Sequence, residues 1–128
     1  MKDRLTEVAR DFASRSYSPY SHFRVGAAVL CEDGSVFGGT NVENASYGLS
    51  MCAERTAMFA AAAAGYARKM EMLVVYAPTE SLTMPCGACR QVMAELLSEG
   101  AQIVVTNGVL EAVYDVDALL PGAFGLDV

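Results

Sequence analysis

Apolar side chains recur at helical spacing near the start of the chain. Between residues 4 and 12 they repeat every three or four positions, as on one face of a helix. The next stretch, SYSPYS, contains serines and Pro19 and breaks this pattern. We therefore predict a first helix that ends near Ser16.

The apolar pattern then changes to two strand-like segments within FRVGAAVLCEDGSVFGGTNV. Asp33 and Gly34 separate them, and this dipeptide accepts the backbone angles of a tight hairpin turn. The segment predicts a β-hairpin.

Helix-forming and strand-like segments alternate in the rest of the chain. Good helix formers run from Cys52 to about Ala64, and Gly65 stands where a C-terminal cap is expected. The apolar run EMLVVYAP then predicts a buried strand. In CGACRQVMAELLSEG, Leu97 completes an apolar helical face and Gly100 closes the predicted helix. AQIVVTN predicts another buried strand, and EAVYDV predicts an edge strand.

This order of elements predicts an α/β fold. Five strands form one mixed sheet, and helices cover both of its faces in a three-layer α/β/α arrangement. Because helices connect the later strands, we expect those strands to be parallel. At 128 residues the chain is most simply a single domain spanning residues 1–128.

Charge and composition narrow the classes of partner. The formal net charge of −6 repels phosphate backbones and anionic membrane surfaces, so we expect neither nucleic acid nor membrane as a partner. The charged N-terminus, MKDRLTEVARDF, and the lack of a long apolar run predict a cytoplasmic protein. Hydrophobic residues make up 53% of the chain, and this surplus favours a homo-oligomer.

Three cysteines stand at the starts of predicted helices. Cys86 and Cys89 form a Cys-x-x-Cys pair at the start of one predicted helix, and Cys52 stands at the start of the preceding predicted helix. A helix N-terminus favours the thiolate, which is the form that binds metals. Three protein ligands leave one position of a tetrahedral zinc ion open, as in catalytic zinc sites. Glu54 could then reach a water molecule at the open position.

Two alternatives remain open for these cysteines. If Cys31 were a fourth ligand, the zinc site would be closed and structural. If Cys86 and Cys89 were a redox dithiol, Cys52 and Glu54 would have no role.

The motifs CAER and PCGACRQV together resemble the zinc-dependent cytidine deaminase family, in its small branch that acts on nucleosides. The resemblance also covers YSPYSHFRVGAAV, GGTNVENASYGLSMCAERTAMF and LLPGAFG, and thus most of the chain. It implies hydrolytic deamination of cytidine and deoxycytidine with release of ammonia, in pyrimidine salvage. Deamination of a related compound, such as a nucleoside antibiotic, stays open as an alternative.

The resemblance also implies roles for individual residues. One Zn²⁺ per subunit is held by Cys52, Cys86 and Cys89, and Glu54 moves the protons. Arg55 offsets the negative charge of the thiolates.

For the substrate, the resemblance implies that Asn41 and Glu43 bind the ribose hydroxyls and that Phe23 faces the pyrimidine ring. The backbone around Ala53 reads the edge of the base. Phe124 reaches the active site of a neighbouring subunit, because members of this length are typically homotetramers.

Overall fold

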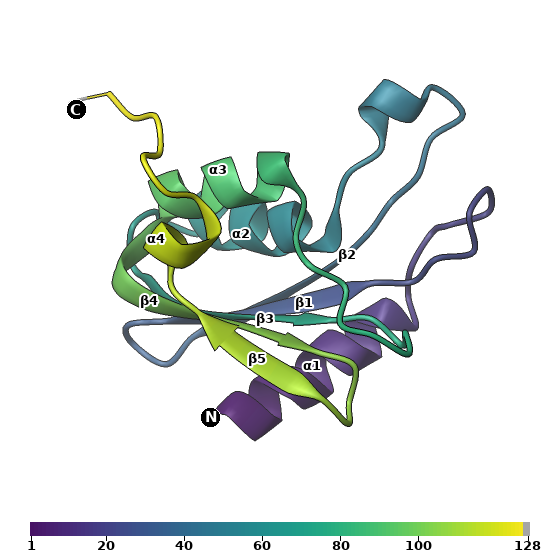
Figure 1. Ribbon diagram of the computed structural model, residues 1–128, viewed down its shortest axis with the longest axis horizontal. Coiled ribbons are helices and arrows are strands. Elements are labelled where there is room, and N and C mark those ends of the chain that lie inside the picture. The colour runs from purple at the N-terminus through teal and green to yellow at the C-terminus, as the bar shows by residue number, and fades with distance from the viewer. Residues whose placement is uncertain (127–128) are drawn as a thin grey trace.

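A five-stranded mixed sheet forms the middle layer of the computed structural model, which describes residues 1–126 (Figure 1). In chain order the strands are β1 (Gly26–Cys31), β2 (Val36–Thr40), β3 (Met70–Tyr76), β4 (Leu97–Thr106) and β5 (Glu111–Tyr114). Their order across the sheet is β2-β1-β3-β4-β5. β3 and β4 are parallel, and the other neighbouring pairs are antiparallel. The predicted mixed sheet is confirmed, although β5 runs against β4 because a tight turn joins them.

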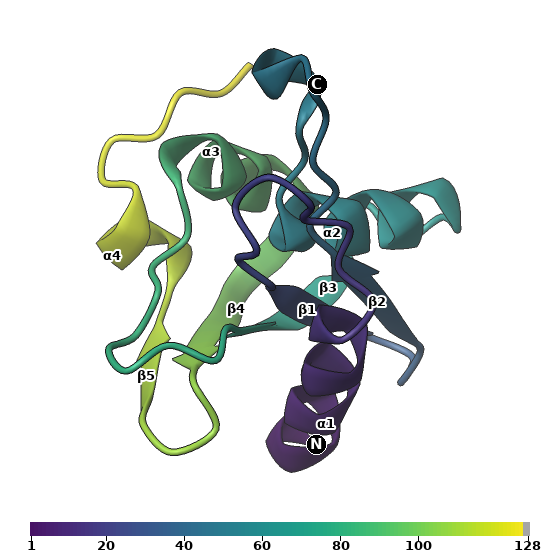
Figure 2. The ribbon, with the colours of Figure 1, turned by 90° about the vertical axis from the view of Figure 1, so that its right-hand side faces the viewer.

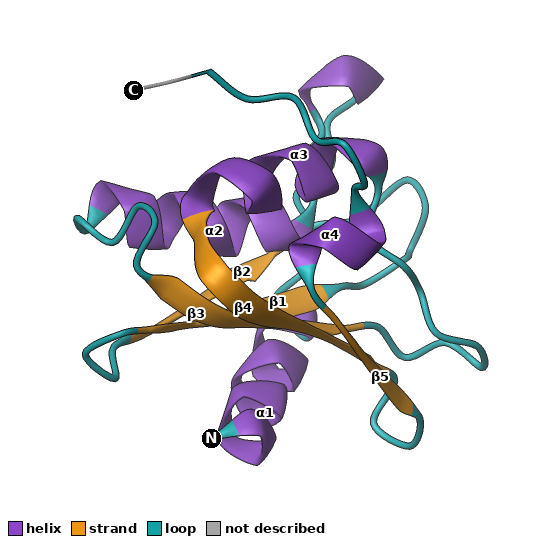
Figure 3. Cartoon of the chain, turned by 60° about the vertical axis from the view of Figure 1, so that its left-hand side comes forward, coloured by secondary structure: helices purple, strands orange, loops and turns teal. Residues whose placement is uncertain are grey.

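Helices cover both faces of this sheet, as predicted (Figure 3). They are α1 (Lys2–Ala13), α2 (Ala53–Ala63), α3 (Gly87–Leu96) and α4 (Val116–Leu119). Among the helices of residues 1–126, α1 lies alone on one face, where Leu5 and Ala9 pack against Val74 and Val104. α2, α3 and α4 lie on the other face, over the larger of the two apolar cores.

Glycines in the hairpin allow the two layers of helices to approach the sheet closely. A Cβ atom at Gly26 would collide with the backbone of α1 at Ala9. A Cβ atom at Gly39 would collide with the backbone of α2 at Ala57. The hairpin is therefore held between the helical layers by backbone contact as well as by apolar side chains.

The helix boundaries follow the predicted signals at α2 and depart from them at α3. Cys52 and Cys86 are the N-caps of α2 and α3, and Gly65 ends α2 with a φ of +98°. The predicted helix up to Gly100 is wrong in its last turn, because Leu97 has extended backbone angles and pairs with Met70 in the sheet. A longer strand β4 replaces that turn.

Two short helices were not predicted from the sequence. Residues Tyr47–Leu49 form a 3-10 helix, η1, in the segment between β2 and α2. The four residues of α4 are capped by Asp115, whose Oδ1 accepts a hydrogen bond from the backbone N of Ala118. None of the helices within residues 1–126 has the length and apolar character needed to cross a bilayer.

Candidate active site and metal centre

The three cysteines predicted as ligands converge between the starts of α2 and α3. The sulfur atoms of Cys52, Cys86 and Cys89 all lie within 4.8 Å of one another. The Cys52–Cys86 and Cys86–Cys89 sulfur distances are 3.8 and 3.5 Å. Two N-caps and one residue in the first turn of α3 thus supply three donors at one point of the fold.

This sulfur cluster fits a zinc ion. Zn–S bonds of about 2.3 Å in a tetrahedron place the sulfur atoms roughly 3.8 Å apart, which agrees with the observed spacing. Three protein donors also leave one position of a tetrahedron free for a water or substrate atom. The cluster therefore suits a catalytic rather than a closed structural site.

Cys31 lies outside the cluster. Its side chain is completely buried at the end of β1, and it does not belong to the group of three sulfur atoms. Burial raises the pKa of Cys31 to about 11, so it remains a neutral thiol at physiological pH. The alternative of a four-cysteine structural site thus lacks its fourth ligand.

Hydrogen bonds in the cluster favour a thiolate at Cys52. The pKa of Cys52 is lowered to about 5, first by a hydrogen bond from Cys89 and further by one from Arg55. Arg55 Nη2 donates to Cys52 Sγ at 3.4 Å. The pKa of Cys89 is raised, because its thiol is a donor in this arrangement and because it is buried. A divalent cation would compensate the charge of a second and a third thiolate.

Glu54 lies beside this cluster in the first turn of α2. The whole residue is only 5% exposed, although it is acidic. Burial raises the pKa of its carboxyl group above the usual value for glutamate. A carboxyl group with a raised pKa can both accept and donate protons near neutral pH.

A cavity of about 270 Å³ opens next to Glu54. Its lining gathers most of the residues that the sequence predicts for the site, from four separate segments of the chain. These are Phe23, Asn41, Glu43, Cys52, Ala53, Glu54 and Cys86. The loop after α1 and the segment from β2 to α2 project beyond the same end of the sheet, on the right in Figure 1 and toward the viewer in Figure 2. Both contribute residues to the lining.

Further lining residues were not predicted as parts of the site. They are Val25, Ser50, Met51, Val75, Thr83 and Met84. Thr83 and Met84 directly precede the Pro-Cys pair in the sequence, so their proximity to the cysteines is a signal that could have revealed them. Val75 could be found only from its place in the sheet.

The side chains of Asn41 and Glu43 are already hydrogen bonded within the protein. Asn41 Nδ2 donates to the carbonyl of Phe23 at 2.7 Å, and its Oδ1 accepts from the backbone N of Val25 at 3.0 Å. Glu43 Oε1 accepts from the backbone N of Tyr20 at 3.0 Å. Both side chains keep capacity for a ligand, because an amide has a second N–H and a carboxylate has further lone pairs.

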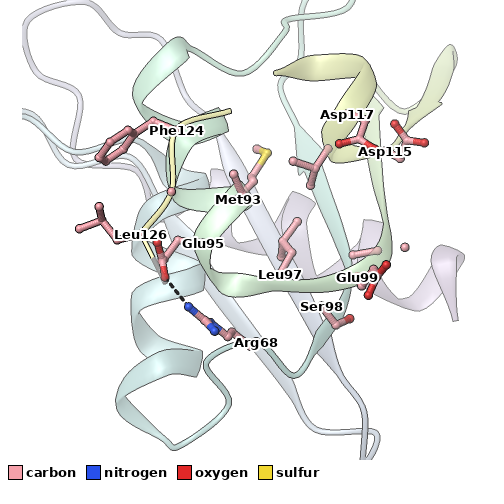
Figure 4. A pocket seen from close by; sticks show the side chains of 15 residues that line it. Arg68, Met93, Glu95, Leu97, Ser98, Glu99, Asp115, Asp117, Phe124 and Leu126 are labelled. Carbon is pink, nitrogen blue, oxygen red and sulfur yellow. Dashed lines mark hydrogen bonds and ion pairs between the residues drawn. The ribbon is translucent and has the colours of Figure 1, made fainter. Parts of the chain in front are cut away.

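Phe124 does not line the cavity beside the cysteines. It is 70% exposed and lies at a second cavity, of about 560 Å³, between α3, β4 and the C-terminal segment. Figure 4 shows this second cavity, with the ring of Phe124 and the ion pair of Arg68 with Glu95 at 2.8 Å. This larger cavity contains none of the cysteines.

Arg90 joins α3 to α4 rather than facing the cysteine cluster. Its Nε donates to the carbonyl of Pro85, and its Nη1 donates to the carbonyl of Leu119, both at 2.9 Å. This arginine therefore fixes the start of α3, where Cys86 and Cys89 lie.

Known proteins share both the sequence and the fold of this chain. The family model described as the cytidine and deoxycytidylate deaminase zinc-binding region matches residues 1–106. A cytidine deaminase of Halalkalibacterium halodurans is 51% identical over 111 residues, which cover 85% of this chain and 83% of the relative.

Solved structures agree. The crystal structure of a cytidine deaminase from Burkholderia pseudomallei is 48% identical and superposes with a TM-score of 0.93, over 97% of this chain and 99% of that chain. That of a cytidine deaminase from Mycobacterium tuberculosis is 41% identical with a TM-score of 0.84, over 98% of both chains. Since the family model spans most of the chain and these relatives cover nearly all of it, the chain belongs to the cytidine and deoxycytidylate deaminase family.

Proposed function

We propose that this protein hydrolyses cytidine and deoxycytidine to uridine and deoxyuridine with release of ammonia, as an enzyme of pyrimidine salvage. The observation that carries the proposal is the cavity whose lining brings the buried Glu54 together with the sulfur cluster and with Asn41 and Glu43. Family membership and cytidine deaminase relatives support the same reaction.

The metal would be one Zn²⁺ per subunit, held by Cys52, Cys86 and Cys89. When bound, the zinc ion supplies Lewis acidity that makes a water molecule nucleophilic near neutral pH. The low pKa of Cys52 provides the first thiolate for such a site. Arg55 donates a hydrogen bond to Cys52 Sγ and so withdraws negative charge from that sulfur. This would preserve the Lewis acidity of a zinc ion bound to the three thiolates.

Glu54 would move the protons that the reaction requires. Hydrolysis takes one proton from the attacking water and a second from the hydroxyl group that this water leaves on the ring. It delivers one of them to the ring nitrogen next to the reacting carbon and the other to the departing amine. A single carboxyl group beside the reacting carbon can perform these transfers in turn. The raised pKa of Glu54 suits it to donate as well as to accept.

The other lining residues would hold the nucleoside. Phe23, which is 40% exposed, offers an aromatic face for the pyrimidine ring. Asn41 and Glu43 would bind the sugar hydroxyls through their remaining N–H group and lone pairs. The backbone at Ala53, where α2 begins, would bind the edge of the base.

We further propose that the chain acts as a single domain in a cytoplasmic homotetramer. Tyr47 and Leu49 are 77% and 69% exposed, and Phe124 is 70% exposed at a distance from the cavity of its own chain. Large apolar side chains with this exposure favour burial against other copies. Phe124 would then complete the cavity of a neighbouring subunit.

Ammonia release from a panel of substrates tests the proposed reaction. The purified zinc-loaded protein is given cytidine, deoxycytidine, cytosine and cytidine monophosphate in parallel. We expect turnover of both nucleosides and far less turnover of the free base, because cytosine lacks the sugar that Asn41 and Glu43 would bind. Cytosine or the nucleotide as the preferred substrate would contradict the proposal.

A further inference from the structure

A loop residue outside the predicted site controls the carboxylate of Glu43. Glu43 Oε1 accepts hydrogen bonds from the backbone N of Tyr20 at 3.0 Å and of Ser21 at 3.2 Å. Glu43 Oε2 accepts a hydrogen bond from the hydroxyl of Ser21. Two of these three donors belong to Ser21, so this residue holds both oxygens of the carboxylate.

The same hydroxyl group also holds the backbone of Phe23. Ser21 Oγ accepts a hydrogen bond from the backbone N of Phe23 at 3.0 Å. A serine hydroxyl has one proton and two lone pairs. Since Phe23 donates to one lone pair, the hydroxyl proton is free to point at Glu43. One oxygen atom thus links the carboxylate proposed to bind the sugar with the residue proposed to face the base.

The other side of Phe23 is fixed by Asn41. The carbonyl of Phe23 accepts from Asn41 Nδ2 at 2.7 Å, while Asn41 Oδ1 accepts from Ser16 Oγ at 2.6 Å. Hydrogen bonds therefore hold the peptide groups directly before and after Phe23. Directly before Phe23, His22 has a φ of +59°, so the loop makes a tight turn there.

We propose that Ser21 is a positioning residue that sets Glu43 and Phe23 in the arrangement that binds the nucleoside. This inference rests on the proposed function, because the roles of Glu43 and Phe23 come from it. Ser21 contacts neither the cysteine cluster nor Glu54 in this network. Its effect should therefore appear in substrate binding rather than in the chemical step.

Replacing the hydroxyl tests this role. We expect Ser21→Ala to raise the KM for cytidine about tenfold, because the loss of a hydrogen bond to a charged group typically weakens binding by about this factor. The value of kcat should be nearly unchanged, because the lost contact stabilises bound substrate and transition state equally. The rise should be clearly smaller for 2′,3′-dideoxycytidine, which lacks the hydroxyls for Glu43. Ser21→Thr keeps a hydroxyl and should restore most of the affinity for cytidine.

Ser14→Ala is the matched control. Ser14 is also an exposed serine, and its hydroxyl donates one hydrogen bond, to the carbonyl of Asp11. This variant should keep the KM for both nucleosides, and both alanine variants should remain folded at the assay temperature, as their thermal midpoints will show. An equal rise in KM for the two nucleosides with Ser21→Ala, or no recovery with Ser21→Thr, would overturn the proposal.

Calorimetric binding of the product uridine separates this inference from the proposed reaction. The dissociation constant should rise about tenfold in Ser21→Ala. If the wild type binds uridine but releases no ammonia, the proposed reaction fails and the binding shift still decides the role of Ser21. If the wild type neither releases ammonia from cytidine nor binds uridine, both proposals fail.

Discussion

The hydrogen bond from Arg55 to Cys52 brings the positive charge of a guanidinium group to the sulfur cluster. Arg55 Nη2 lies 3.4 Å from Cys52 Sγ, at the first turn of the helix that Cys52 caps. The hydrogen bond from Cys89 and that from Arg55 together lower the pKa of Cys52 to about 5. Arg55 therefore contributes, after Cys89, to how readily the Cys52 thiol loses its proton.

We predict that Arg55→Gln raises the pKa of Cys52 in the metal-free protein. A neutral side chain stabilises the thiolate less than a guanidinium does, so a higher pH is needed to ionise the thiol. The thiolate absorbance of metal-free protein, followed as pH is raised, measures this change. Arg15→Gln is the control, because Arg15 pairs with Asp11 on the surface. Identical titrations of Arg55→Gln and wild type would contradict the role.

The elements that carry the site were largely predictable, because their signals are local. Cys52 and Cys86 could be recognised as helix starts from the residues around them, and the hairpin from Asp33-Gly34. The end of α3 was misread because an apolar residue at Leu97 fits the helical period, while its pairing with Met70 depends on the sheet. η1 and α4 are too short to produce a periodic pattern.

Contacts between distant segments could not be predicted. Nothing near Ser21 in the sequence indicates that its hydroxyl meets Glu43, because the loop after α1 and the segment after β2 meet only in the folded chain. The position of Phe124 away from the cavity of its own chain likewise depends on the path of the C-terminal segment. The spacing of the cysteines and their positions at helix starts indicated the three candidate metal donors, but only the fold shows what orients the side chains of the cavity.

At the level of elements, Gly39 sets the approach of α2 to the hairpin. We predict that Gly39→Ala lowers the free energy of unfolding by about 1–3 kcal/mol, because its new methyl group would meet the backbone of Ala57. Chemical denaturation measures the change. Gly48→Ala is the control, since a Cβ atom at Gly48 meets nothing within 4 Å. Equal effects of the two substitutions would contradict the packing argument.

At the scale of the whole molecule, the proposed assembly makes each cavity depend on two chains. Phe124 is highly exposed in its own chain and is separate from the cavity that holds Glu54. A subunit that lacks a functional Glu54 could therefore still supply Phe124 to its neighbour. Mixed oligomers can therefore show whether each cavity uses Glu54 from one chain and Phe124 from another.

We predict that Phe124→Ala lowers kcat/KM by roughly ten- to a hundredfold, as for the loss of a buried aromatic contact at an interface. Mixed oligomers of Phe124→Ala and Glu54→Gln subunits should be more active than either parent, because some cavities would then combine an intact Glu54 with an intact Phe124. Activity is measured after the subunits have been exchanged. Mixtures that stay at the level of their parents would count against shared cavities.

The most direct test of the account measures zinc content and ammonia release from cytidine for the wild type and Glu54→Gln. Because Glu54 is proposed to move protons and not to bind the metal, the variant should keep one zinc ion per subunit and lose a factor of about 10²–10⁴ in kcat. Glu7→Gln, a change at an exposed glutamate of α1, serves as the control and should behave as wild type. A Glu54→Gln variant that keeps both its zinc and most of its activity would contradict the account.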